Sequence, residues 1–271
     1  MIPSFNLHSH TVRCDGKNTA EEMVKAAINL GCDGIGFSGH SYVEGVNTPD
    51  RKEERYERYI EDVIRVKEKY GHRIDILMGV EYDMKSIIDT TPFDYIIGGA
   101  HILDYEGDLI LVDSSFKKLD DKVKEYFDGD YYKLCELYYE QLSKVITYTD
   151  CDIVAHFDLV TKYNEGGVLF NTEDNRYLDA AFNCLDTLIK KDPIFEINTG
   201  AIARGYRKMP YPSKPILKRI AELGGRAIIT TDCHNAEFLL CFYEEAIDYA
   251  AECGLRELWY PKNGQFVPYR I

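Results

Sequence analysis

Apolar segments with strand character alternate with amphipathic helical segments about seven times along this chain of 271 residues. The expected strands cover residues 2–7, 34–40, 74–82, 94–101, 153–156, 194–198 and 227–234. The expected helices cover residues 19–30, 50–70, 130–149, 172–190, 212–223 and 236–253. Such an alternation is typical of a parallel sheet whose strands are joined by right-handed helical crossovers. We therefore expect an α/β barrel that forms one domain over residues 1–271.

Local signals set some of the boundaries of these elements. Thr19 is expected to cap the first helix, with Glu22 completing a capping box and Gly31 ending the helix. Residues 103–128 are the least periodic part of the chain, so we expect an excursion from the barrel, such as a lid or a substrate loop. Residues 255–260 could form a short closing strand.

Polar side chains recur at the carboxyl ends of the expected strands. They include six of the seven histidines and two carboxylates: His8, His10, His40, Glu81, His101, His156, Asp232 and His234. In a β/α barrel these strand ends converge on one face, where active sites lie. Only His72 lies elsewhere, in a turn. Isolated core histidines would account for one or two of these positions, but not for six.

The same residues have the composition of a cluster of metal ligands. His8 and His10 are two apart in an extended segment, so their side chains point to the same face. Asp15, in the turn Asp15-Gly16, adds a third carboxylate. Six imidazoles and three carboxylates are too many for one ion, but they suit two or three divalent ions that share a bridging carboxylate. Mixed nitrogen and oxygen ligands without thiolate are typical of Zn²⁺, Mn²⁺, Fe²⁺ or Co²⁺.

Clustered divalent ions indicate phosphate-ester hydrolysis, because they generate hydroxide near neutral pH and hold the oxygens of an in-line displacement. Each carboxylate also has a purely structural interpretation. Asp15 could only form a turn, and Glu81 could cap the helix that follows its strand. Asp232 and His234 could form a hydrogen-bonded pair instead of binding metal.

Charge and composition exclude several classes of partner. The chain has 46 acidic and 32 basic residues, a formal net charge of −14, which disfavours nucleic acid and anionic membranes. We find no signal peptide, and no apolar run approaches the ~18 residues of a membrane span. The eight cysteines include no C-x-x-C pair, so reduced thiols in a cytoplasmic protein are expected. The oligomeric state is not indicated.

As a set, the motifs resemble those of the polymerase and histidinol phosphatase (PHP) family of metal-dependent phosphoesterases. They are His8-Ser-His10, Asp15-Gly16, Gly39-His40, Gly79-Val-Glu81, Gly99-Ala-His101, Ala155-His156-Phe-Asp158 and Thr231-Asp232-Cys-His234. The stretch 196–207, followed by Tyr211-Pro212, resembles the histidinol-phosphatase branch of that family. The resemblance implies a distorted (β/α)₇ TIM-like barrel.

The resemblance also implies how the ligands are shared. One metal would be held by His8, His10, Glu81 and Asp232, a second by Glu81, His101 and His156, and a third by Asp15, His40 and His234. Some family members have histidine at the position of Asp15, so the metal of the third site is the least defined.

For the reaction, the resemblance implies hydrolysis of a small phosphate monoester, in particular L-histidinol phosphate, by a hydroxide that bridges the metals. Arg204, Lys162 and Arg207 are candidate phosphate ligands, because arginine offers a bidentate fork to phosphate oxygens. Arg207 could instead be an ordinary surface charge. Asp232 is also a candidate proton donor to the leaving alkoxide. No residue resembles an activated nucleophile, so no covalent intermediate is expected.

Three alternatives remain open. The enzyme could act on another phosphomonoester, such as a nucleotide or a phosphotyrosine peptide. The chain could instead be a metal-binding module without turnover. A metal-dependent amide hydrolase is weaker, because no strand-borne bridging lysine is evident.

Asp104 or Asp113 could pair with the ammonium group of a histidinol.

Overall fold

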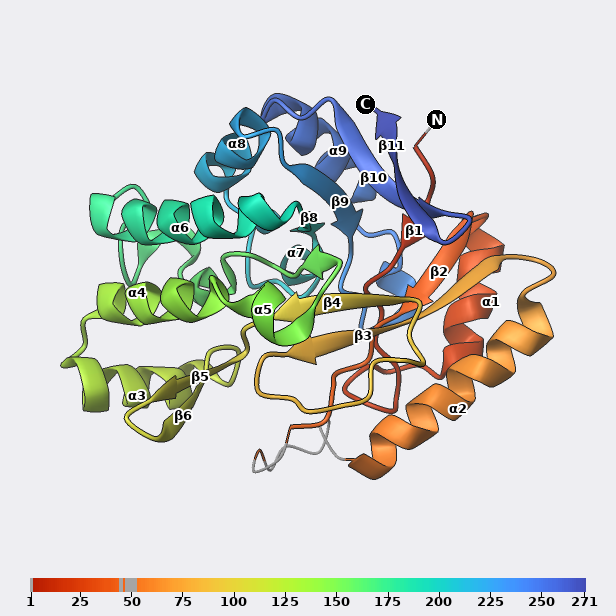
Figure 1. The fold of residues 1–271 in the computed structure, drawn as a ribbon, viewed down its shortest axis with the longest axis horizontal. Coiled ribbons are helices and arrows are strands. Elements are labelled where there is room, and N and C mark those ends of the chain that lie inside the picture. The colour runs from red at the N-terminus through yellow and green to blue at the C-terminus, as the bar shows by residue number, and fades with distance from the viewer. Residues whose placement is uncertain (1, 44–45, 47–52) are drawn as a thin grey trace.

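The computed structural model describes residues 2–43, 46 and 53–271. Its main sheet has seven strands in the order β1-β2-β3-β4-β7-β8-β9, and all neighbouring strands are parallel. The strands are β1 (Phe5–Asn6), β2 (Gly34–Phe37), β3 (Asp75–Asp83), β4 (Tyr95–Gly99), β7 (Ile153–Val154), β8 (Ile194–Asn198) and β9 (Arg226–Thr230). This is the expected parallel α/β arrangement (Figure 1).

The first and last strands meet just beyond their carboxyl ends. Ser9 and Cys233 form a parallel bridge, in which the Cys233 N–H donates to the His8 carbonyl at 2.9 Å and the His10 N–H donates to the Cys233 carbonyl at 2.8 Å. This contact turns the sheet into a barrel. It also brings the segments that follow β1 and β9 side by side.

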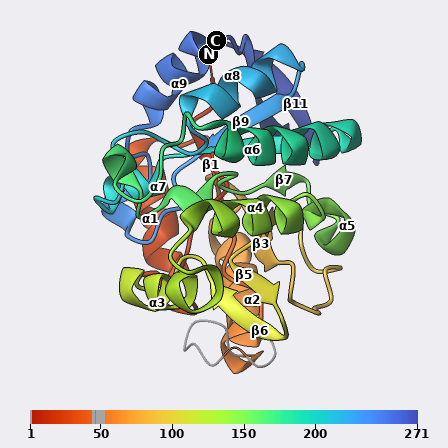
Figure 2. The same cartoon turned by 90° about the vertical axis from the view of Figure 1, so that its left-hand side faces the viewer.

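Helices cover the outside of the barrel (Figures 1 and 2). They are α1 (Ala20–Leu30), α2 (Glu53–Tyr70), α4 (Tyr131–Leu142), α5 (Val145–Thr149), α6 (Asn175–Leu188), α8 (Lys214–Glu222) and α9 (Tyr243–Glu252). Their buried faces include the tyrosines of α4, since Tyr138 and Tyr139 are fully buried and the Tyr139 hydroxyl donates to the Tyr177 hydroxyl at 2.9 Å. No helix in the described part of the chain is long and apolar enough to cross a membrane.

The cap predicted for α1 is confirmed. The Thr19 hydroxyl accepts the Glu22 N–H, and a Glu22 carboxylate oxygen accepts the Thr19 N–H at 2.8 Å. Gly31 ends the helix at φ 70°, a conformation that glycine adopts without strain. The expected start of the next helix, at residues 50–52, lies outside the described residues, and α2 is described from Glu53.

Two expected helices are interrupted. Residues 130–149 form α4 and α5, separated at Ser143, whose hydroxyl donates back to the Glu140 carbonyl at 2.7 Å. Residues 236–253 form a 3₁₀ turn, Ala236–Phe238, and then α9. Three further 3₁₀ turns (Leu159–Thr161, Glu165–Gly167 and Ile189–Lys191) and the short helix α7 (Gly200–Ala203) complete the connections.

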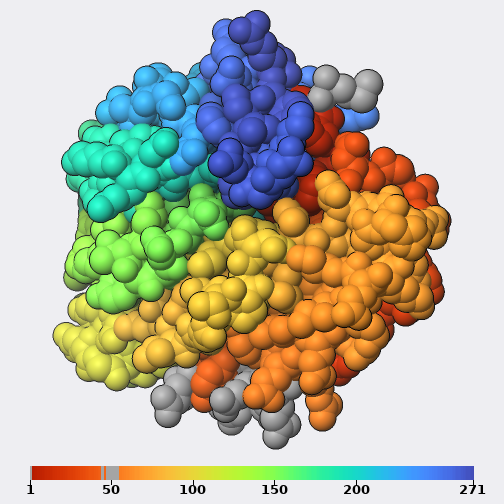
Figure 3. All heavy atoms as spheres, turned by 45° about the vertical axis from the view of Figure 1, so that its right-hand side comes forward, coloured from red at the N-terminus to blue at the C-terminus, as the bar shows by residue number. Residues whose placement is uncertain are grey.

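The closing strand expected at residues 255–260 is wrong. These residues belong to β10 (Glu257–Lys262), which pairs antiparallel with β11 (Gln265–Arg270) instead of joining the barrel. The turn is Asn263-Gly264, with φ 52° and 75°, the usual chemistry of a two-residue hairpin. The hairpin lies on the surface beside the N-terminal segment (Figure 3) and, with the starts of β1, β3 and β4, lines a depression at the amino end of the barrel.

Residues 103–128 leave the barrel, as expected, but they are more regular than the sequence indicated. They contain the hairpin β5 (Ile102–Tyr105) and β6 (Asp108–Leu111), followed by α3 (Phe116–Phe127). Asp108 ties the two parts together, because it accepts from Lys122 at 2.5 Å and from the Tyr126 hydroxyl at 2.7 Å. This excursion lies on the side of the molecule where α4 packs (Figure 2).

Candidate metal centre

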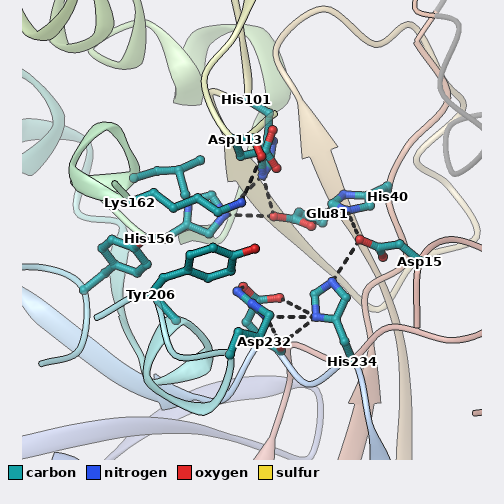
Figure 4. A pocket seen from close by; sticks show the side chains of 14 residues that line it. Asp15, His40, Glu81, His101, Asp113, His156, Lys162, Tyr206, Asp232 and His234 are labelled. Carbon is teal, nitrogen blue, oxygen red and sulfur yellow. Dashed lines mark hydrogen bonds and ion pairs between the residues drawn. The ribbon is translucent and has the colours of Figure 1, made fainter. Parts of the chain in front are cut away.

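The nine predicted ligands converge at the carboxyl end of the barrel, and all but His8 and His10 are labelled in Figure 4. They stand in, or directly after, β1, β2, β3, β4, β7 and β9, with Asp15 in the turn after β1: His8, His10, Asp15, His40, Glu81, His101, His156, Asp232 and His234. Most are buried, and Glu81 is 1% exposed. The structure therefore brings together all nine residues that the sequence analysis selected.

Glu81 lies at the centre of the cluster, and its two carboxylate oxygens face different histidines. Oε2 is 3.4 Å from His8 Nε2 and 3.5 Å from His10 Nε2. Asp232 Oδ1 approaches the same two nitrogens at 3.6 and 3.2 Å. These four residues surround one point, and they are the predicted ligands of the first metal.

The other oxygen of Glu81 faces the second predicted group. Oε1 is 2.9 Å from His101 Nε2 and 3.0 Å from His156 Nε2, and the two nitrogens are 3.2 Å apart. One carboxylate thus borders two sets of imidazoles, which is the geometry that a bridging ligand needs.

The third predicted group is less separate from the others. Asp15 Oδ2 is 3.0 Å from His234 Nε2 and 3.5 Å from His40 Nε2. His10 joins this group through Nδ1, 3.2 Å from Asp15 Oδ1. His40 also points its Nδ1 at Glu81 Oε2, at 2.8 Å. His10 and His40 therefore each border two groups, a sharing that the sequence did not predict.

The donor set fits divalent metal ions. Nε2 of His8, Nε2 of His10 and Oε2 of Glu81 are buried and face one another, but none of them forms a hydrogen bond of regular geometry. An unpaired polar atom in the protein interior is costly. Lone pairs of imidazole and carboxylate that converge on one point are stabilised by a cation with mixed nitrogen and oxygen ligation.

The charges of the cluster also favour a bound cation. Burial raises the pKa of each carboxyl, but the imidazoles, together with Arg204 for Asp232, hold the pKa of Asp15, Glu81 and Asp232 well below the usual value. Burial lowers the pKa of His8 and His10, but the neighbouring acidic groups raise both pKa values well above the usual one. In the metal-free protein, protons on imidazole therefore supply part of the positive charge that the carboxylates require.

A cavity of about 210 Å³ opens onto the cluster. Its walls combine Glu81 and six other predicted ligands with Arg204 and with Lys162, Asp113 and Tyr206, the last three of which are labelled in Figure 4. Arg204 donates to Asp232 Oδ2 at 2.9 Å and to the Asp232 carbonyl at 2.8 Å. Lys162 donates to the Asp113 carbonyl at 2.9 Å. Two cations thus line the same cavity of small-molecule size as the predicted metal ligands.

Two backbone features allow the close contact between Arg204 and Asp232. Asp232 lies at φ 44°, in the left-handed region that residues other than glycine rarely adopt and that is often found at functional sites. At Gly200, a Cβ would lie 2.7 Å from the Thr231 carbonyl oxygen and 3.0 Å from the Arg204 guanidinium. The absence of a side chain at Gly200 lets Arg204 reach Asp232.

Comparison with known proteins agrees with this architecture. The model of the PHP domain matches residues 6–200, well over half of the chain. The chain belongs to the PHP domain family. A curated relative from Clostridium acetobutylicum, named probable histidinol-phosphatase, is 28% identical over 275 residues, which cover 96% of this chain and 97% of the relative.

Two solved structures share the fold of this chain. HisK from Listeria monocytogenes is 19% identical, with a TM-score of 0.78 over 89% of this chain and 99% of that one. The histidinol phosphate phosphatase of Lactococcus lactis, in complex with zinc, L-histidinol and phosphate, is 18% identical, with a TM-score of 0.67 over 98% and 100% of the two chains. The distorted TIM-like barrel of this PHP chain is thus the fold of these enzymes.

One predicted phosphate ligand lies away from the cavity. The Arg207 guanidinium donates to the Thr161 hydroxyl, is 3.7 Å from Asp158 Oδ2 and lies over the Tyr211 ring. It lines a different depression, at the start of α8. The phosphate role of Arg207 stays a prediction that its position does not favour.

The sequence analysis did not select the carboxylates that lie behind the ligands. Asp83 Oδ2 accepts the His101 N–H at 3.0 Å and lies 3.3 Å from His101 Nδ1. Glu196 Oε1 lies 2.5 Å from His8 Nδ1. The available signal in the sequence was an acidic residue within an apolar strand that is buried on both faces. Burial of such a charge is unfavourable unless a partner compensates it.

Proposed function

We propose that this protein hydrolyses L-histidinol phosphate to L-histidinol and phosphate with the help of two or three divalent metal ions. The observation that carries this proposal is the single cavity in which a cluster of metal-ligand residues faces Arg204 and Lys162. The histidinol-phosphatase names of the relatives support the choice of substrate. Zinc in the complex from Lactococcus lactis supports zinc as one of the ions.

The residues that would hold the ions are those predicted from the sequence, with Glu81 as the bridge. Ions bound there would lower the pKa of a water molecule and polarise the phosphate. The low pKa values of Glu81, Asp15 and Asp232 keep these carboxylates ionised, as ligands must be. They also favour a ligand role for Asp232 over the proton-donor role that we considered.

The phosphate group would be oriented by Arg204 and Lys162, the two cations that line the cavity. Arg204 has a fixed guanidinium, because Asp232 accepts from both of its terminal nitrogens. Such a preset donor stabilises charge on phosphate oxygens without reorganisation. Lys162 is held by the Asp113 carbonyl and lies 4.8 Å from the centre of the Tyr206 ring, so its ammonium stays at the cavity wall.

The leaving group would contact Asp113 and Tyr206, which line the same cavity. Asp113 lines the cavity and also the adjoining groove, and its carboxylate would suit the ammonium of histidinol. Asp104, the other predicted candidate, pairs with Lys85 at 2.8 Å and lines a different depression.

A test follows directly. The purified protein, loaded with Zn²⁺ or Mn²⁺, should release phosphate from L-histidinol phosphate at least tenfold faster, by kcat/KM, than from other small monoesters. Hydrolysis in ¹⁸O-labelled water under single-turnover conditions should place the label in the phosphate. Label in the protein would contradict direct attack by water.

One observation favours a second candidate, a phosphatase for larger monoesters. A groove of about 650 Å³ adjoins the cavity, shares Asp15, His40, Asp113 and Lys162 with it, and continues along β6 and α3. The substrate panel should therefore include phosphotyrosine peptides and nucleotides. A protein that binds metal but hydrolyses none of these compounds would instead be a binding module.

We also propose that the enzyme acts in the cytoplasm as one domain, without nucleic acid or membrane as partner. The eight free cysteines and the net charge of −14 support this part of the proposal.

A further inference from the structure

Glu196 occupies the one strand of the barrel that supplies no predicted metal ligand. It lies in the middle of β8, and its side chain is fully buried beside the predicted ligands His8 and His156. Oε1 accepts from the Thr230 hydroxyl at 2.6 Å and lies 2.5 Å from His8 Nδ1. Oε2 accepts from the His156 backbone N–H at 2.7 Å and from the Asn198 amide at 2.9 Å. The carboxylate is thus fully hydrogen-bonded.

The contact with His8 determines which nitrogen of that ring can bind a metal. An ionised carboxylate only accepts hydrogen bonds, so His8 Nδ1 must carry a proton. In the neutral ring that would bind a metal, the lone pair then lies on Nε2, which faces Glu81 and Asp232. A carboxylate behind a ligating histidine fixes the ring in this way and raises its affinity for the ion.

The second oxygen of Glu196 reaches the other side of the cluster. His156 Nε2 belongs to the group around Glu81 Oε1, whereas His8 belongs to the group around Oε2. One buried carboxylate therefore contacts the ring of His8 in one group and the backbone of His156 in the other. Asp83 provides a contrast, because its Oδ2 contacts His101 while its Oδ1 accepts from the Lys85 N–H at 2.9 Å, outside the cluster.

We propose that Glu196 is a positioning residue that sets the orientation of His8 and its spacing from His156, and so controls metal affinity on both sides of Glu81. This inference rests on the metal centre of the proposed function. It concerns this chain's own residues and does not depend on which phosphate ester is hydrolysed.

The test compares Glu196→Gln with Thr230→Val. The glutamine keeps the shape of the side chain, but its amide nitrogen must face either His8 and Thr230 or the His156 N–H, so one set of hydrogen bonds is lost. The valine removes one donor to the same carboxylate and leaves the His8 and His156 contacts in place. Zn²⁺ affinity of the metal-free proteins is measured by competition with a chelator, and the unfolding midpoint of each metal-free protein is measured in parallel.

Glu196→Gln should weaken Zn²⁺ binding roughly 10- to 100-fold, while Thr230→Val should stay within about threefold of the parent protein. Long-range ¹H–¹⁵N spectra of the zinc-loaded proteins should show His8 protonated at Nδ1 in the parent and in Thr230→Val. If Glu196→Gln does not fold, Glu196→Asp replaces it, since the shorter carboxylate cannot reach both His8 and His156.

Parent-like zinc affinity in the Glu196 variant would overturn the inference, as would equal weakening in Thr230→Val. The failure of the proposed function is a separate result. In that case the parent protein would not hydrolyse L-histidinol phosphate, yet the zinc titrations would still decide the role of Glu196.

Discussion

Replacing Glu81 by glutamine should remove the metal centre while the barrel stays folded. The side chain is 1% exposed, and its two oxygens contact imidazole nitrogens at 2.8–3.5 Å on both sides. Glutamine conserves the volume but removes the negative charge that these groups share. Loss of one partner from a buried charged pair costs about 3–5 kcal/mol. Applied to metal binding, this corresponds to roughly 10²- to 10⁴-fold weaker affinity.

The assay is a Zn²⁺ or Mn²⁺ titration of the metal-free Glu81→Gln protein, with phosphate release from L-histidinol phosphate at saturating metal. Glu222→Gln, at the exposed end of α8, is the matched control and should behave as the parent protein does. A Glu81→Gln protein that retains parent metal stoichiometry and a kcat/KM within fivefold of the parent would refute the bridging role.

The remaining predictions address Arg204, Gly200 and the charge of the cluster. Arg204→Lys keeps the positive charge but loses the guanidinium fork and its hydrogen bonds to charged groups. The rate of phosphate release at subsaturating substrate should therefore fall roughly 10- to 100-fold. An unchanged kcat/KM would argue against a phosphate role for Arg204. Gly200→Ala should lower both kcat/KM and the melting temperature, because its Cβ would collide with the Thr231 carbonyl and the Asp232 side chain, at 2.7 and 2.9 Å; parent-like values of both would contradict the crowding. Thermal unfolding of the metal-free protein should show higher stability near pH 6 than near pH 8. The pKa of His8 is higher in the folded than in the unfolded protein. Its protonation therefore stabilises the fold fully below the unfolded pKa, and this stability is lost as the pH rises through the folded pKa. The lowered carboxyl pKa values should remove stability only as the pH falls below about 4.5, so a metal-free protein most stable above pH 8 would contradict this charge balance.

The strands and the face on which the site lies could be predicted from the sequence, because both follow from short-range patterns. Each buried strand is a compact apolar run, and the side chains that end the runs must meet at one end of a parallel barrel. His40, His101 and His156 are therefore recognisable without coordinates.

The way in which the ligands are shared could not be predicted. His40 turns Nδ1 toward Glu81 and Nε2 toward Asp15, a matter of side-chain rotation that residue spacing does not determine. Asp232 reaches His8 and His10 from a backbone at φ 44°, which no local signal indicates. Arg204 and Arg207 are three apart in sequence, yet only Arg204 lines the cavity.

Two misses had a signal that was present in the sequence. Asn263-Gly264 between two apolar runs is the usual pattern of a hairpin, and it excludes a single closing strand at residues 255–260. Glu196, in the middle of a strand of buried residues, indicated a buried acid that needs a partner.

Hydrolysis by this protein should require bound metal. The decisive measurement is elemental analysis of the purified protein in parallel with its rate of L-histidinol phosphate hydrolysis, before and after complete chelation and after addition of Zn²⁺ or Mn²⁺. We expect two or three ions per chain, loss of activity as they are removed and recovery as they are restored. A protein that hydrolyses L-histidinol phosphate at full rate without bound metal would contradict the account.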